Sequence, residues 1–144
     1  MMDMNSVGAL LRFAHLSSNM VLSKTLKPFS LSTEQWIILN IVRPASRTQK
    51  ELAEFLNSDQ SSITRMVDAL EKNSYVQRIV HPTDRRAKMV QISAYGLETL
   101  SKVDKVTSKL SAQFDENFTP EELNQLKEYL KRISHNNELY LKQI

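Results

Sequence analysis

The stretch from Thr48 to Ser93 constrains the fold most, because helix and strand signals follow one another there at short intervals. A threonine followed three residues later by a glutamate is typical of a helix start, since the two side chains can satisfy free backbone amides reciprocally. Thr48 and Glu51 therefore predict a capping box at the start of a short helix. The apolar side of this helix consists of Leu52, Ala53, Phe55 and Leu56.

A second helix, of about four turns, is expected after a tight connection. Asn57 or Ser58 is expected to cap it, with Asp59 in its first turn. One face repeats apolar residues at spacings of three and four, which predicts a buried side made of Ile63, Met66, Val67 and Leu70. The opposite face is polar and carries Ser61, Arg65, Asp68 and Lys72, flanked by Ser62 and Thr64. Taken alone, such a face indicates an ordinary solvated helix surface.

A basic hairpin is expected next. Two β-prone segments, Tyr75 to Ile79 and Met89 to Ser93, enclose the turn-rich loop HPTDRRAK. Pro82 and Asp84 favour chain reversal there, while Arg85, Arg86 and Lys88 supply positive charge. Asp84 either orients one arginine through a charge-assisted hydrogen bond or forms an ordinary stabilising ion pair. Two helices followed by such a hairpin are the outline of a winged helix-turn-helix.

This outline predicts double-stranded DNA as a partner. A recognition helix that enters the major groove needs short side chains near its start and a group such as arginine that pairs with guanine. In this chain these residues are Ser61, Ser62, Thr64 and Arg65. The loop residues Asp84, Arg85, Arg86 and Lys88 are then placed to contact the phosphate backbone or a narrow minor groove.

The segment LAEFLNSDQSSITRMVDALEKNSYVQRIVHPTDRRAKMVQIS resembles the DNA-binding core of MarR-type transcriptional regulators, whose wing bears a characteristic Asp-Arg-Arg. LSTEQWIILNIV, at Leu31 to Val42, is similar to the family's second helix, so the resemblance covers nearly the whole chain. The resemblance implies a homodimer that binds a pseudo-palindromic operator, usually as a repressor. It also implies that a small aromatic or amphipathic ligand often releases the protein from the operator. Many relatives have glycine where this chain has Ser74, and Asn73 is expected to take the left-handed conformation here.

Flanking helices complete a fold that is mainly α with a small two-stranded antiparallel wing, in the α+β class. The patterns predict helices from Ser6 to Lys27, from Ser32 to Val42 and from Leu97 to about Phe118, with Gly96 permitting a change of direction. A last helix is expected to begin at Thr119. The chain is thus expected to be one domain, with a winged core at about 30–94 and dimerisation helices at about 5–27 and 97–144.

The first and last helices carry apolar stripes that need a covering surface. They either pack within the chain or interleave between two protomers, and the family resemblance favours the dimer. Asn137 in the last stripe either fixes the register or faces solvent near a frayed end. The expected dimerisation residues are Leu10, Leu11, Leu123, Leu130, Ile133, Asn137 and Tyr140.

Composition agrees with one folded domain, since 41% of the 144 residues are hydrophobic. A net charge of +3 permits binding to a polyanion without establishing it. The charges near the wing are more informative, because Asp84 is the one acid among Arg78, Arg85, Arg86 and Lys88. The absence of cysteine fits a reducing cytoplasm and excludes sensing by thiol oxidation. No apolar run is long enough to cross a membrane, so a cytoplasmic location is expected.

Two rival functions are compatible with a chain of this size. An enzyme is disfavoured, because His15, His81 and His135 are isolated and no phosphate loop or nucleophile motif is present, so no metal or cofactor is expected. His81 is expected near phosphate and His15 in the core or at a ligand junction. A winged helix that docks another protein is the second alternative, which the basic loop disfavours. Trp36, Phe13 and Met20 either line a ligand pocket or belong to the core.

Overall fold

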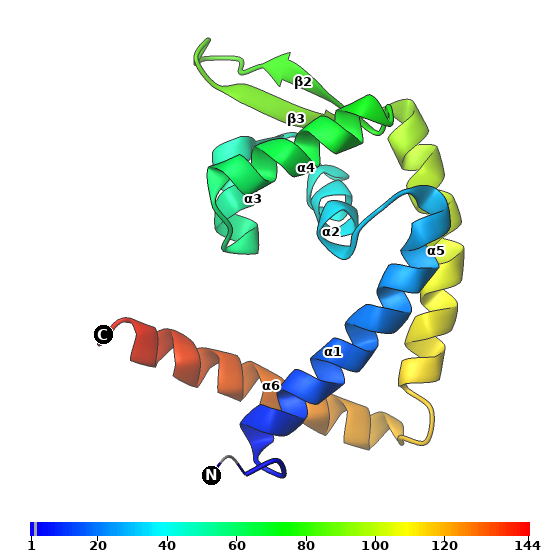
Figure 1. Ribbon diagram of the computed structural model, residues 1–144, viewed down its shortest axis with the longest axis vertical. Helices are drawn as coiled ribbons and strands as arrows, with labels where there is room; N and C mark the ends of the chain where they lie inside the picture. The colour runs from blue at the N-terminus through cyan, green and yellow to red at the C-terminus, as the bar shows by residue number, and fades with distance from the viewer. Residues whose placement is uncertain (2) are drawn as a thin grey trace. The chain divides into compact units, whose positions relative to one another are not determined.

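The computed structural model describes Met1 and residues 3–144. The elements follow in the order α1 (Val7–Leu26), the 3₁₀ helix η1 (Lys27–Phe29), α2 (Thr33–Val42), β1 (Arg47–Thr48), α3 (Gln49–Leu56), α4 (Gln60–Lys72), β2 (Val76–Val80), β3 (Lys88–Ile92), α5 (Ala94–Phe114) and α6 (Pro120–Leu141) (Figure 1). The predicted fold class, mainly helical with a small antiparallel wing, is confirmed. Contacts divide the chain into two compact units, Met1–Thr107 and Ser108–Ile144.

Three helix starts follow directly from local side-chain chemistry. Ser6 accepts a hydrogen bond from the Ala9 amide at 3.2 Å and caps α1. Reciprocal capping boxes start α2, through Ser32 and Gln35, and α6, through Thr119 and Glu122. Each box satisfies two backbone amides that a helix start would otherwise leave unpaired. The predicted starts of these helices are therefore confirmed.

The sheet of the first unit has three strands in the order β1-β3-β2. β2 and β3 form the predicted antiparallel wing, with Val76 opposite Ile92 and Val80 opposite Lys88. β1 adds a third strand on the other side of β3, where Arg47 lies opposite Val90. Sequence patterning does not predict this strand, because two residues are too few to show an alternation.

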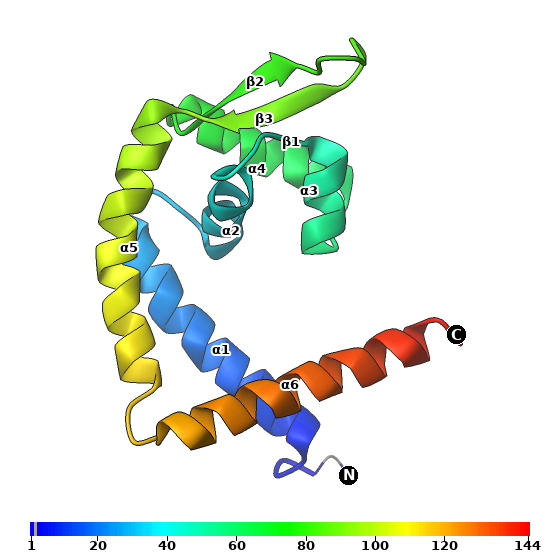
Figure 2. The ribbon, with the colours of Figure 1, turned by 180° about the vertical axis from the view of Figure 1, so that it is seen from behind.

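The core of the first unit lies between the sheet and helices α2, α3 and α4, which pack against its strands (Figures 1 and 2). Its fully buried side chains include Ile38, Leu39, Leu52, Ile63, Val67, Leu70 and Val90. This confirms the apolar face expected for α4, although Met66 is only partly buried. Phe55, which the sequence places on the apolar side of α3, is 61% exposed, and the Arg47 guanidinium lies 5.7 Å from its ring centroid.

Two backbone expectations were wrong. Ser74, with φ 65°, takes the left-handed conformation expected of Asn73. The amides of Ser74 and Tyr75 donate to the carbonyls of Glu71 and Leu70, a pattern that places the left-handed residue one position after the cap. Gly96 does not change the chain direction. It lies buried in α5, where a Cβ atom would overlap the Tyr75 carbonyl oxygen.

The second unit, Ser108–Ile144, contains the end of α5 and all of α6. α5 ends at Phe114, four residues earlier than expected, and Asn117 takes a left-handed conformation with φ 68° before α6 begins. α6 buries none of its residues. Across the described residues, no helix is both long and apolar enough to cross a membrane.

Candidate nucleic-acid interface

The start of α4 is organised by Asp59, which is the cap in place of the expected Asn57 or Ser58. Its carboxylate accepts hydrogen bonds from the Ser61 hydroxyl at 2.6 Å, the Ser62 amide at 2.7 Å and the Ser62 hydroxyl at 3.0 Å. These bonds, led by that from Ser61, lower the pKa of Asp59 to about 2. Asn57 instead closes α3 in a left-handed conformation, with φ 47°.

The four residues expected to contact bases differ in their surroundings. Ser61 and Arg65 are exposed, whereas Ser62 and Thr64 are half-buried. The Thr64 hydroxyl donates to the Gln60 carbonyl at 2.9 Å and accepts from the Gln49 side-chain amide at 2.9 Å. The Arg65 guanidinium donates to the Ser62 hydroxyl at 3.2 Å. Ser61 and Arg65 therefore lie on the open surface of α4, while Thr64 links α4 to α3.

The wing loop presents three exposed cations, Arg85, Arg86 and Lys88. Within the described part of the chain, none of them forms an ion pair. The Asp84 carboxylate accepts a hydrogen bond from the backbone amide of Arg86 at 3.0 Å, so it shapes the turn. The expected bond from Asp84 to an arginine side chain is not formed within the described residues. The loop cations are thus available to an external anion.

His81 has a structural role in the same loop. Its Nδ1 atom accepts hydrogen bonds from the backbone amides of Thr83 and Asp84, both at 3.1 Å. Because both donors are backbone N–H groups, Nδ1 must be unprotonated and Nε2 must carry the ring proton. His81 therefore holds the turn that precedes Arg85 and Arg86.

Arg78 was expected to add to the positive charge of the wing, and that expectation was wrong. Its guanidinium lies 2.6 Å from the Asp68 carboxylate and 2.9 Å from that of Glu71. The same side chain donates to the Gln49 side-chain oxygen at 3.0 Å. Two carboxylates of α4 neutralise Arg78, which thereby fastens the wing strand β2 to the recognition helix.

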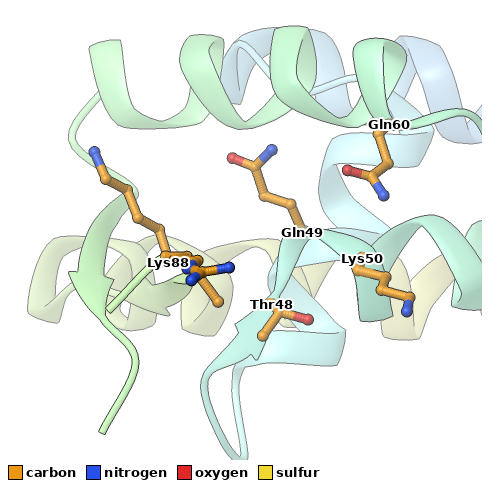
Figure 3. Close-up of a pocket in the computed structure, with 7 residues that line it drawn as sticks. Thr48, Gln49, Lys50, Gln60 and Lys88 are labelled. Atoms are coloured by element: carbon orange, nitrogen blue, oxygen red, sulfur yellow. The ribbon is translucent and has the colours of Figure 1, made fainter. Parts of the chain in front are cut away.

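An open hollow of about 400 Å³ lies between the start of α3, the start of α4 and the wing. Gln60 points from α4 into the hollow, and Gln49 points from the start of α3 toward α4 (Figure 3). None of the described residues that line the hollow is acidic, and three of them are cations. The lining residues are Thr48, Gln49, Lys50, Gln60, Arg86, Ala87 and Lys88.

Lys50 and Gln60 were missed in the sequence. Lys50 is the second residue of α3, two positions after the capping Thr48, and the helix start alone explains the residues around it. Because Asn57 or Ser58 was expected to cap this helix, Gln60 was not expected at its first position. A cap at Asp59 makes Gln60 the first residue of α4, the position from which a recognition helix reaches the bases.

The residues considered for ligands and metals do not form a closed site. Phe13 and Met20 are exposed, and His15 is exposed and so is not a core histidine. Trp36 is half-buried, and its indole Nε1 is buried without an acceptor among the described residues. No three His, Asp or Glu side chains of the described residues gather as a metal site would require.

Solved structures with the same fold come from bacteria and archaea. A cysteine-to-serine mutant of MarR from Escherichia coli, solved in complex with operator DNA, is 26% identical, with a TM-score of 0.81 over 88% of this chain and 92% of that one. The transcriptional regulator BldR from Sulfolobus solfataricus is 28% identical, with a TM-score of 0.75 over 85% and 91%. A MarR transcriptional regulator from Methanosarcina mazei, at 18% identity, shares the fold with a TM-score of 0.82 over 93% and 97%.

Fold and site together define a winged helix-turn-helix protein, with a recognition helix beside a basic wing. Residues 31–88 match the model of the MarR family. The central part of this chain is therefore similar to the MarR family, and the chain has the fold of MarR-family transcriptional regulators.

Proposed function

We propose that this chain is a cytoplasmic, sequence-specific DNA-binding repressor that acts as a homodimer on a pseudo-palindromic operator. The winged core, at about 30–94, binds the DNA. Helices at about 5–27 and 97–144 form the dimer. Binding of a small aromatic or amphipathic ligand releases the protein from the operator.

The observation that carries the proposal is the pairing state of the cations near α4. Arg78 is neutralised by Asp68 and Glu71, whereas Arg85, Arg86 and Lys88 are exposed and form no ion pair within the described residues. An uncompensated cluster beside a recognition helix suits phosphate contacts, which supply salt-dependent affinity. Arg65, on the open face of α4, then pairs with guanine and contributes sequence preference.

Exposed apolar side chains on α1 and α6 support the dimer. Leu10 is 49% exposed and Leu130 is 40% exposed in the single chain. Tyr140 and Asn137 are also exposed, while Leu11, Leu123 and Ile133 are half-buried. Large apolar groups left open on long helices mark a surface that a partner covers. A twofold axis through such an interface would set two recognition helices about 34 Å apart, one helical turn of DNA.

The DNA proposal is tested by selecting bound duplexes from a random pool with the purified protein at near-physiological salt. We expect enrichment of an inverted repeat whose half-site centres are about ten base pairs apart. Binding that falls with salt but shows no sequence enrichment would contradict specific recognition. It would favour a winged helix that docks another protein.

The dimer is tested by sedimentation at micromolar concentration, where we expect a species of twice the chain mass. Leu130→Glu places a charge in the apolar stripe of α6 and should shift the protein toward monomer. Gln125→Glu adds the same charge to α6 outside that stripe and serves as the matched control. A wild-type protein that sediments as a monomer would refute this part of the proposal.

Ligand release draws support from Trp36, the single tryptophan of the chain. A buried indole N–H without an acceptor costs about 1–3 kcal/mol, so an incoming carboxylate or carbonyl oxygen would be favoured there. Titration with a small aromatic carboxylate such as benzoate, followed by tryptophan fluorescence, should show saturable change and weaker operator binding. A protein that keeps its operator affinity at saturating benzoate would exclude this ligand class.

A further inference from the structure

The start of α4 offers few free hydrogen-bonding groups, although it is rich in hydroxyls. The hydroxyl protons of Ser61 and Ser62 are donated to Asp59, and that of Thr64 is donated to the Gln60 carbonyl. A serine or threonine hydroxyl has one proton to donate, so these three residues have none left for a base. They are therefore limited to accepting hydrogen bonds at the DNA surface.

Gln60 differs from these neighbours. It is the first residue of α4, it is exposed, and its side-chain amide forms no hydrogen bond with any described residue. The side chain points into the hollow between α4, α3 and the wing (Figure 3). Both its oxygen and its NH₂ group remain available.

The chemistry of this position favours a base over a phosphate. A glutamine amide matches the adjacent N7 acceptor and N6 donor of adenine, which it can contact with two hydrogen bonds in the major groove. Phosphate oxygens accept only, so half of the amide would be unused there. The cations that share the hollow, Lys50, Arg86 and Lys88, are better suited to phosphates.

We propose that Gln60 is a specificity-determining residue that selects adenine at one position of each operator half-site. The inference rests on the proposed function, since it requires the start of α4 to enter the major groove. Arg65 and Gln60 then divide the reading of the half-site between guanine and adenine.

The test repeats the selection from a random duplex pool with wild-type protein, Gln60→Ala, Gln60→Glu and the control Gln113→Ala in α5. We expect Gln60→Ala to lose an adenine preference of roughly tenfold at one position of each half-site, with the other positions unchanged. Gln60→Glu should move that preference to cytosine, whose N4 group donates to a carboxylate. Gln113→Ala should retain the wild-type preferences.

The outcomes separate this inference from the proposed function. A clear inverted repeat for the wild type, with the same base preferences in Gln60→Ala, overturns the role of Gln60 alone. Uniformly weaker binding by Gln60→Ala without a change in preference also overturns it, because it indicates a phosphate contact. Absence of any enriched repeat for the wild type overturns both proposals.

Discussion

The Arg78 guanidinium lies 2.6 Å from the Asp68 carboxylate and joins the wing strand β2 to the recognition helix α4. The Arg78 side chain is 16% exposed, whereas that of Asp68 is 60% exposed, so the contact lies at the edge of the core. Glu71 and Gln49 complete the environment of Arg78. The relative placement of helix and wing thus depends on a cation that the charge pattern alone would assign to DNA.

Arg78→Ala should lower the free energy of unfolding by about 1–2 kcal/mol, since it removes hydrogen bonds to two carboxylates in a partly exposed setting. Arg85→Ala, at an exposed residue without an ion pair, should change that free energy by less than about 0.5 kcal/mol. Urea unfolding of both variants at one protein concentration measures the difference. Equal stability of the two variants would refute the structural role of Arg78.

Gly96→Ala should be destabilising by about 1–3 kcal/mol, because the added methyl group would overlap the Tyr75 carbonyl and force α5 away from that backbone. Gly8→Ala in α1 is the matched control, since nothing lies within 4 Å of its Cβ position. We expect Gly8→Ala to raise stability slightly, by up to about 0.5 kcal/mol. Thermal unfolding at equal protein concentration checks both changes, and a Gly96→Ala protein as stable as wild type would contradict the close packing.

His81→Ala should loosen the wing loop, because the Thr83 and Asp84 amides lose their shared acceptor. His81→Asn should preserve the loop, since the asparagine side-chain oxygen occupies the position of the histidine Nδ1 atom relative to the backbone. Amide hydrogen exchange measured by NMR should rise roughly fivefold at both amides in the alanine variant, as expected for one lost hydrogen bond. Unaltered exchange in His81→Ala would show that the ring does not hold the turn.

Asp59 should contribute stability that depends on pH in a defined window. Its pKa is lowered from 3.8 to about 2 in the folded chain, so the folded state favours the ionised carboxylate. This contribution to stability is present in full above the pKa of Asp59 in the unfolded chain. It is lost as the pH falls through the pKa of Asp59 in the folded chain. Melting temperatures of wild type and Asp59→Asn should therefore differ by a constant amount above about pH 5 and change relative to each other between about pH 5 and pH 2. Parallel curves throughout would contradict the ionised cap.

The sequence predicts features that arise from neighbours along the chain. The capping boxes at Ser32 and Thr119 follow from residue types three positions apart, and the buried face of α4 follows from the spacing of Ile63, Val67 and Leu70. The wing hairpin follows from two β-prone segments around a turn. These patterns carry their own physical causes, so they can be interpreted without tertiary structure.

Features that depend on contacts distant in sequence could not be predicted in this way. Arg78 is neutralised by residues seven and ten positions away on another element, so counting charges near the wing misassigned it. The overlap between a Gly96 side chain and the Tyr75 carbonyl exists only after α5 packs. Gln60 is the first residue of α4 because Asp59 caps that helix. The Asp59 carboxylate accepts hydrogen bonds from the Ser61 hydroxyl and the Ser62 amide.

The most direct test of the proposed mechanism is a fluorescence anisotropy titration of Arg65→Ala and Arg86→Ala against two duplexes, the selected operator and a shuffled control. We predict that Arg65→Ala loses most of the difference in affinity between the duplexes, because it removes a base contact. Arg86→Ala should weaken binding to both duplexes alike and reduce the dependence on salt, because it removes a phosphate contact. Wild-type affinity of both variants for both duplexes would contradict DNA recognition by α4 and the wing.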